Sequence, residues 1–118
     1  MQIEEFYEKV GGSFSEVLGR LMTRERVEKY VKRFLSDRSF TELSDGYERQ
    51  DWNAVFLAAH TMKGVCGTLG FENLMKASSE LTENVRSKAA NADTEGLFMK
   101  LSDEYRNTVG AIREYAGD

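Results

Sequence analysis

One histidine, His60, stands in this chain beside a lysine and two glycines, in the stretch AAHTMKGVCG at residues 58–67. Helical residues three, four and seven apart share a face, so Lys63, Gly64 and Gly67 are the C-terminal neighbours of the imidazole. Imidazole is a usable nucleophile near neutral pH because much of it is uncharged there. These residue types therefore predict a histidine that carries an anion and offers it to another protein.

The periodicity of this helix separates the histidine from the core. At about 100° per residue, the apolar side chains lie about 140° to 260° around the helix from His60. This buried stripe consists of Val55, Ala58, Ala59, Met62, Val65, Cys66 and Leu69. Gly64 and Gly67 each cost about 1 kcal/mol relative to alanine, and they lie on the histidine face. Glycines that served helix packing would lie on the apolar side, so we interpret these two as space for a partner.

The same residues resemble a known family. The pattern His60-x-x-Lys63-Gly64, with Gly70 ten residues after the histidine, is similar to the signature of histidine-containing phosphotransfer (HPt) domains. The preceding alanine pair, and Gly70 with Phe71, also resemble the phosphotransfer domain of chemotaxis-type histidine kinases. The close resemblance covers residues 52–85, and the helical pattern fits the HPt bundle over most of the chain.

The resemblance implies a role for each residue of the motif. His60 would accept a phosphoryl group on its outward nitrogen, Nε2. Lys63 would offset charge on the phosphoryl oxygens, and Gly64 would leave room for the partner's aspartate and its metal. Gly67, on the same face, is assigned to steric access as well.

Some HPt domains carry glutamine or glutamate 22 residues after the histidine, where it orients the imidazole. Thr82 occupies that position here, with Glu83 beside it. Thr82 has a shorter reach, but it is able to accept a hydrogen bond from Nδ1–H, so it is the candidate for orienting His60. The resemblance further implies receiver domains and a histidine kinase as partners, with Mg²⁺ held by the receiver. This chain shows no nucleotide-binding motif, so we expect a phosphocarrier and not an enzyme, with no cofactor or metal of its own.

Apolar residues recur with helical spacing throughout, and strand-like alternation is absent from the sequence. The stripes predict helices at residues 3–10, 13–21, 24–35, 39–47, 51–69, 71–85 and 97–112. The expected caps are Ser13 with Glu16, Thr23, Ser39 with Glu42, Asp51 and, at the C-terminal end of the histidine helix, Gly70.

These elements predict an all-α fold, an antiparallel up-down four-helix bundle. We assign residues 1–118 to a single domain, with the bundle at residues 24–116 and one or two short helices at residues 1–22 packed on it. Phe56 lies one turn before His60 on the same face. It is either a docking residue for the partner or a partly buried contact with the N-terminal segment.

Composition narrows the function classes further. A net charge of −4 argues against nucleic acid as the main partner. No stretch is long and apolar enough to span a membrane, and the acidic start lacks the basic region of a signal peptide. The single cysteine, Cys66, excludes an internal disulfide and is expected to be buried. We expect a cytoplasmic monomer. The phosphoacceptor domain of a chemotaxis-type kinase and a purely structural interaction module are the alternatives.

Overall fold

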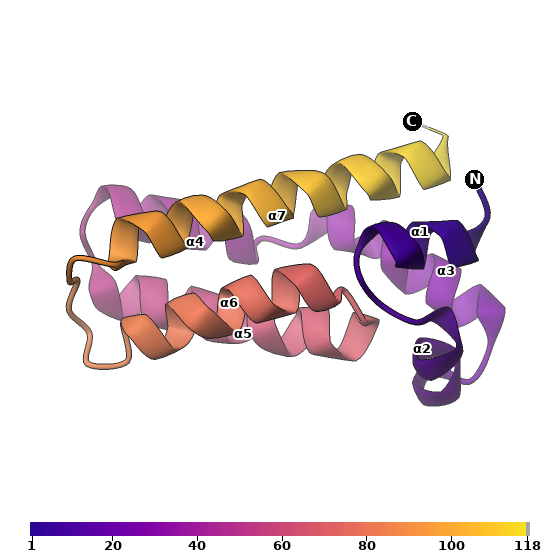
Figure 1. The fold of residues 1–118 in the computed structure, drawn as a ribbon, viewed down its shortest axis with the longest axis horizontal. Helices are drawn as coiled ribbons and strands as arrows, with labels where there is room; N and C mark the ends of the chain where they lie inside the picture. The colour runs from indigo at the N-terminus through magenta and orange to yellow at the C-terminus, as the bar shows by residue number, and fades with distance from the viewer. Residues whose placement is uncertain (118) are drawn as a thin grey trace.

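A computed structural model describes residues 1–117, and every regular element within them is a helix (Figure 1). The all-α prediction is therefore confirmed. In chain order the elements are α1 (Ile3–Lys9), α2 (Phe14–Leu21), α3 (Arg24–Arg33), the 3-10 turn η1 (Phe34–Ser36), α4 (Ser39–Glu48), α5 (Trp52–Leu69), α6 (Glu72–Asn84) and α7 (Thr94–Ala116).

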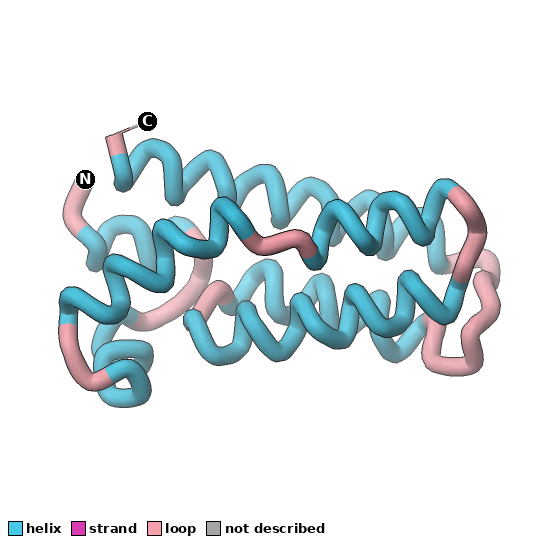
Figure 2. Tube along the Cα trace, turned by 180° about the vertical axis from the view of Figure 1, so that it is seen from behind, coloured by secondary structure: helices cyan, strands magenta, loops and turns pink. Residues whose placement is uncertain are grey.

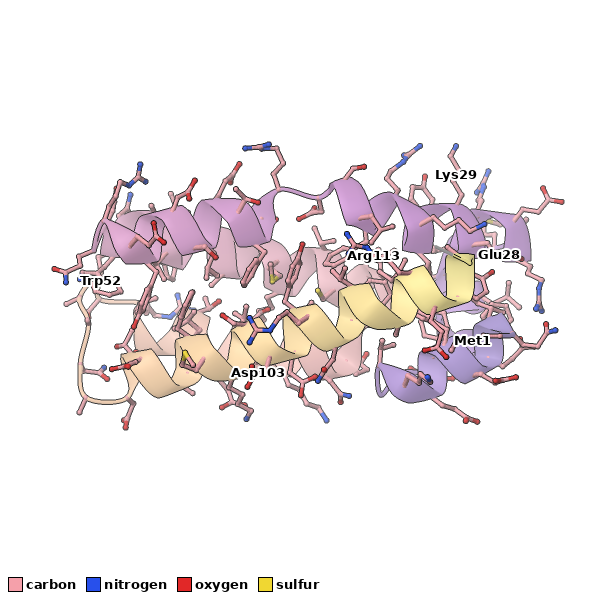
Figure 3. The ribbon with its side chains drawn as sticks, turned by 90° about the horizontal axis from the view of Figure 1, so that it is seen from above. Met1, Glu28, Lys29, Trp52, Asp103 and Arg113 are labelled. Atoms are coloured by element: carbon pink, nitrogen blue, oxygen red, sulfur yellow. The ribbon has the colours of Figure 1, made fainter. Side chains whose placement is uncertain are left out.

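The helices after α2 form an antiparallel four-helix bundle. Its first arm is made of α3 and α4, which follow one another along the bundle with a break at η1 (Figure 2). The other arms are α5, α6 and α7, and α5 packs against both α4 and α6. The bundle is elongated, with extents of 40 × 27 × 20 Å. Trp52 lies at one end of the long axis and Met1 lies at the other (Figure 3).

The histidine helix α5 begins and ends at predicted caps. The side chain of Asp51 accepts a hydrogen bond of 3.1 Å from the backbone N–H of Ala54. At the other end Gly70 adopts a left-handed conformation, with φ of +76°, which stops the helix. Ser13 and Thr23 cap α2 and α3 in the same way as Asp51. Local sequence signals thus define both ends of the helix that carries His60.

The predicted capping box of Ser39 with Glu42 is wrong. Ser39 is the first residue inside α4, and Arg38 stands at the cap position without a side-chain cap. The carboxylate of Asp37 accepts the hydrogen bond from the Ser39 N–H, at 2.9 Å. Because Ser39 is buried against the bundle, the helix starts one residue earlier than the motif indicates, and an aspartate before it takes over the capping role.

The apolar stripes of the arms meet in one core. All the predicted stripe residues of α5 except Val65 are buried, and Val65 is half-buried. Between α4 and α7 the rings of Phe40 and Tyr105 stack at 4.0 Å, and those of Tyr47 and Phe98 stack at 3.9 Å. The aromatic residues thus hold the broken first arm against the last helix. The buried stripe of α5 belongs to this core, and the face that carries His60 lies outside it.

The two N-terminal helices are packed closely on the end of the bundle where α5 turns into α6. The Tyr7 hydroxyl donates a buried hydrogen bond of 2.8 Å to the carbonyl of Leu69. A Cβ atom on Gly12 would lie 2.1 Å from the carbonyl oxygen of Gly70, so only glycine permits this approach. The N-terminal segment therefore contacts the histidine helix directly at its C-terminal end.

Candidate functional site

His60 lies on the exposed face of α5, opposite the buried stripe, as the periodicity predicts. Within residues 1–117 its imidazole makes no hydrogen bond and no ion pair, so both ring nitrogens are open to chemistry. Asp51 and Gly70 fix the ends of the helix, and the packed apolar stripe fixes its rotation. The fold therefore holds the imidazole toward solvent without engaging it.

A shallow hollow of about 410 Å³ lies beside the imidazole. Four residues of the predicted site, His60, Lys63, Gly64 and Gly67, line it together. Its complete lining is Arg20, His60, Lys63, Gly64, Gly67, Thr68 and Met75. The described residues that line it thus include two cations and no carboxylate. Such a surface is suited to an anion bound at the histidine or approaching it.

The two glycines of the hollow serve no packing role within the chain. A Cβ atom on Gly64 would meet nothing within 4 Å, and one on Gly67 would meet only the Met75 side chain, at 3.9 Å. In contrast, a Cβ atom on Gly46 would lie 3.1 Å from the Cβ of Ala54, where α4 crosses α5 closely. Gly46 is a packing glycine, whereas Gly64 keeps space open outside the protein. The alternative explanation by helix packing is therefore excluded for Gly64.

Phe56 lies next to the imidazole and to two cations. Its ring is nearly parallel to that of His60, with an interplanar angle of 12° and 6.1 Å between centroids. The Arg86 guanidinium and the Lys88 ammonium lie 5.5 Å and 5.1 Å from the centre of the Phe56 ring. The alternative contact with the N-terminal segment is wrong, because that segment meets α5 at Gly67 and Leu69, about three turns away.

A second apolar residue beside the histidine was missed in the sequence. Leu57 is 54% exposed, one of the most exposed large apolar side chains of the chain. It lies three residues before His60 and next to Phe56, which is half-buried. The helical periodicity could have revealed Leu57, because it places this residue only about 60° from His60 around the helix. An exposed leucine beside the histidine extends the apolar surface available to a partner.

Thr82 makes a different contact from the predicted one. It is fully buried, and its hydroxyl donates a hydrogen bond of 2.7 Å to the Ser78 carbonyl of its own helix. Among the described residues there is no hydrogen bond between Thr82 and His60. The threonine proton is thus used within α6, and only a lone pair of the hydroxyl oxygen is left for the imidazole. An orienting role for Thr82 stays a prediction.

Glu83 pairs with Arg86, and among the described residues it makes no hydrogen bond with the imidazole. Its carboxylate accepts two hydrogen bonds from Arg86, at 2.7 and 2.9 Å, next to the Phe56 ring. These bonds, together with the nearby positive charge of Lys63, lower the pKa of Glu83. Glu83 is therefore ionised at neutral pH, and it holds Arg86 at the edge of the site.

Arg20 is a site residue that sequence reasoning missed. It comes from α2, and its Nε and Nη2 atoms donate hydrogen bonds to the carbonyls of Thr68 and Gly67, at 3.3 and 3.2 Å. The amphipathic pattern of α2 predicts which of its faces is buried. It carries no information on which helix that face meets. The contact between residues 47 positions apart in sequence was accordingly not predictable from the local pattern.

Cys66 takes no part in the site. It is fully buried on the opposite side of α5, and burial raises the pKa of its thiol. In residues 1–117, no group of three or more His, Cys, Asp or Glu side chains is arranged to hold a metal ion. None of the helices formed by these residues combines the length and apolar character needed to cross a bilayer.

A helical bundle with one unengaged histidine, small residues beside it and cations around it has the features that a phosphocarrier of the histidine type needs. Comparison with protein families supports this class: the Hpt domain family matches residues 23–115. The chain belongs to the Hpt domain family. The match spans α3 to α7 and leaves out α1 and α2. Neither the curated proteins nor the solved structures gave a significant match. Hpt domains carry phosphoryl groups on histidine in phosphorelays, and they interact with histidine kinases and response-regulator receivers.

Proposed function

We propose that His60 accepts a phosphoryl group from a receiver aspartate and donates it to another. The lone pair of Nε2 attacks phosphorus, the bond between phosphorus and the aspartate oxygen breaks, and the carboxylate leaves with that electron pair. The product is a phosphoramidate on His60, and transfer to the next receiver reverses these steps. The observation that carries the proposal is the exposed imidazole beside Gly64, where a Cβ atom would meet nothing within 4 Å.

Lys63 would stabilise the charge of the transferred phosphoryl group, and the two glycines would let the receiver approach His60. Lys63 lines the same hollow as His60 and is half-buried, so its ammonium group is able to stabilise charge on the phosphoryl oxygens. This stabilisation grows when a docked partner excludes water. Gly64 and Gly67 leave room for the acidic loop of a receiver. Thr82 would orient the imidazole through the lone pair of its hydroxyl.

The residues around His60 do not fit a metal of their own. The charged groups that line the hollow are Arg20 and Lys63, and cations repel Mg²⁺, which prefers oxygen ligands. We therefore assign any Mg²⁺ used in the transfer to the receiver. We also propose that the chain is a phosphocarrier without kinase activity of its own, because Hpt domains are phosphocarrier modules.

The docking surface proposed here combines the apolar residues before His60 with the cations around it. Phe56 and the exposed Leu57 supply the apolar contact. We expect the chain to act as a monomer, because each partner needs this one face of α5. We also expect it to work in the cytoplasm, since a phosphorelay draws its phosphoryl groups from ATP.

The test is phosphorylation of the purified chain by a receiver domain that was loaded with a small phosphodonor. We expect intact-mass measurement to show a single added phosphoryl group, which is lost in acid, as phosphohistidine is. The sequence contains one histidine, so His60→Gln should abolish the added mass. A phosphoryl group that persists in this variant, or that survives acid, would refute the assignment.

A further inference from the structure

Arg20 is held in place at the C-terminal end of α5, with part of its hydrogen-bonding capacity left over. Two of the five guanidinium N–H groups are used, on the carbonyls of Gly67 and Thr68. The side chain is nevertheless exposed. A guanidinium already fixed by two carbonyls loses less conformational entropy when it binds an anion. Arg20 is thus a pre-organised cation with donors to spare.

The position of Arg20 relative to His60 defines what it is able to contact. Both residues line the same hollow. Gly67, to which Arg20 is bonded, lies seven residues after His60, which is about 10.5 Å along the helix. A phosphoryl group on the imidazole does not span this distance. Gly64 and Gly67 line the hollow together with Lys63, Thr68 and Met75. The two glycines leave room for a partner seated on His60 to reach Arg20.

The charge around this face is opposite to that of the whole chain. The net charge is −4, yet Arg20 and Lys63 line the hollow, and Arg86 and Lys88 lie beyond Phe56 on the other side of the imidazole. Arg86 is paired with Glu83, whereas Arg20 and Lys63 are the charged groups that line the hollow itself. An acidic surface complements this arrangement.

We propose that Arg20 is a docking cation that binds a carboxylate on the receiver with which His60 exchanges its phosphoryl group. The inference rests on the proposed function and extends the site into the N-terminal segment, which the family match leaves out. Arginines near a helix C-terminus also bond its last carbonyls for stability alone. A docking role would affect receiver binding in a salt-dependent way, whereas a purely structural role as a cap of α5 would not.

The experiment compares single-turnover phosphotransfer from one loaded receiver domain to the wild type and to three full-length variants. Arg20→Gln removes the charge, and Arg20→Lys keeps it. Arg26→Gln is the matched control, because Arg26 is exposed on α3 and its side chain has no ion pair within residues 1–117. For each protein the half-saturating receiver concentration, the maximal rate and the melting temperature are measured, at ionic strengths of about 0.05 M and about 0.5 M.

At low salt, Arg20→Gln should raise the half-saturating receiver concentration about 5- to 10-fold and leave the maximal rate unchanged. At high salt the difference should fall below about 2-fold, because screening weakens exposed charge pairs. Arg20→Lys keeps the charge but not the fixed guanidinium, so its low-salt affinity should lie between those of Arg20→Gln and the wild type. Arg26→Gln should behave as the wild type.

Two results would overturn the docking role. One is an unchanged half-saturating concentration in Arg20→Gln. The other is a loss that persists at high salt, follows the melting temperature and is not rescued by lysine, which would make Arg20 a structural cap only. A wild type that takes no phosphoryl group from any receiver would instead refute the proposed function itself, and the docking role with it.

Discussion

Gly64 offers the sharpest test of the site, because its removal should improve the fold and impair the function. A Cβ atom there meets nothing within 4 Å, so Gly64→Ala brings the full gain of helix propensity, about 1 kcal/mol, with no steric cost. For a domain of this size that gain raises the melting temperature by about 3 to 5 °C. Gly110, inside α7, has the same open surroundings and is the matched control. Gly110→Ala should be stabilised by the same amount.

Phosphotransfer should separate the two positions. Gly64→Gln extends a side chain over the hollow beside His60, in the path of the receiver, whereas Gly110→Gln lies on another helix. Under single-turnover conditions we expect Gly64→Gln to slow transfer about 10- to 100-fold, since small displacements of reacting groups have effects of that size. Gly110→Gln should transfer at the wild-type rate.

Two results would contradict these expectations for Gly64. If Gly64→Ala lowers the melting temperature while Gly110→Ala raises it, the space beside Gly64 is not open and the packing of α5 differs from the structure. If Gly64→Gln is stable and transfers as fast as Gly110→Gln, the partner does not approach across this residue. Gly46→Ala should be destabilised, because its Cβ would crowd Ala54.

Three further outcomes are expected. His60→Gln should abolish acid-labile phosphorylation and change the free energy of unfolding by less than about 0.5 kcal/mol, as is usual for an exposed side chain; a loss of several kcal/mol in chemical denaturation would mean that the histidine is structural. Lys63→Ala should lower the single-turnover rate with little change in receiver affinity, whereas Lys63→Arg should keep much of the rate; equal rates for all three proteins would remove Lys63 from the mechanism. Burial raises the pKa of Cys66 above its value in the unfolded chain, so the unfolded state ionises first above about pH 8.5 and stability should fall with rising pH. Urea unfolding from pH 8 to 9.5 should show this slope in the wild type and a weaker one in Cys66→Ala.

The bundle and the orientation of the histidine were predictable because both follow from local periodicity. The apolar stripe of α5 specifies which face is buried, and His60 with Gly64 must then lie opposite. The caps at Asp51 and Gly70 were equally predictable from the sequence, because a cap depends on residues within one turn of the helix end.

What escaped prediction depends on contacts between distant elements. Arg20 reaches the carbonyl of Gly67 through the packing of α2 on α5, and the sequence of α2 does not specify that neighbour. Ser39 has the side chain of a cap, but its burial against the bundle shifts the role to Asp37. The hydrogen bond that the Thr82 hydroxyl donates to the Ser78 carbonyl of its own helix was also not predicted, and it leaves the hydroxyl oxygen as an acceptor.

The bonds from Tyr7 and Arg20 to the end of α5 also make the N-terminal segment and the bundle depend on each other for stability. Helix termini fray when their last carbonyls lack donors, and residues 1–22 supply those donors to Leu69 and the two residues before it. The matched segment 23–115 contains every residue of the phosphotransfer motif, but on its own it would have a loosened last turn two turns from the histidine. Amide hydrogen exchange at the end of α5 should therefore quicken when the N-terminal segment is removed. The segment and the bundle are expected to unfold in a single cooperative step.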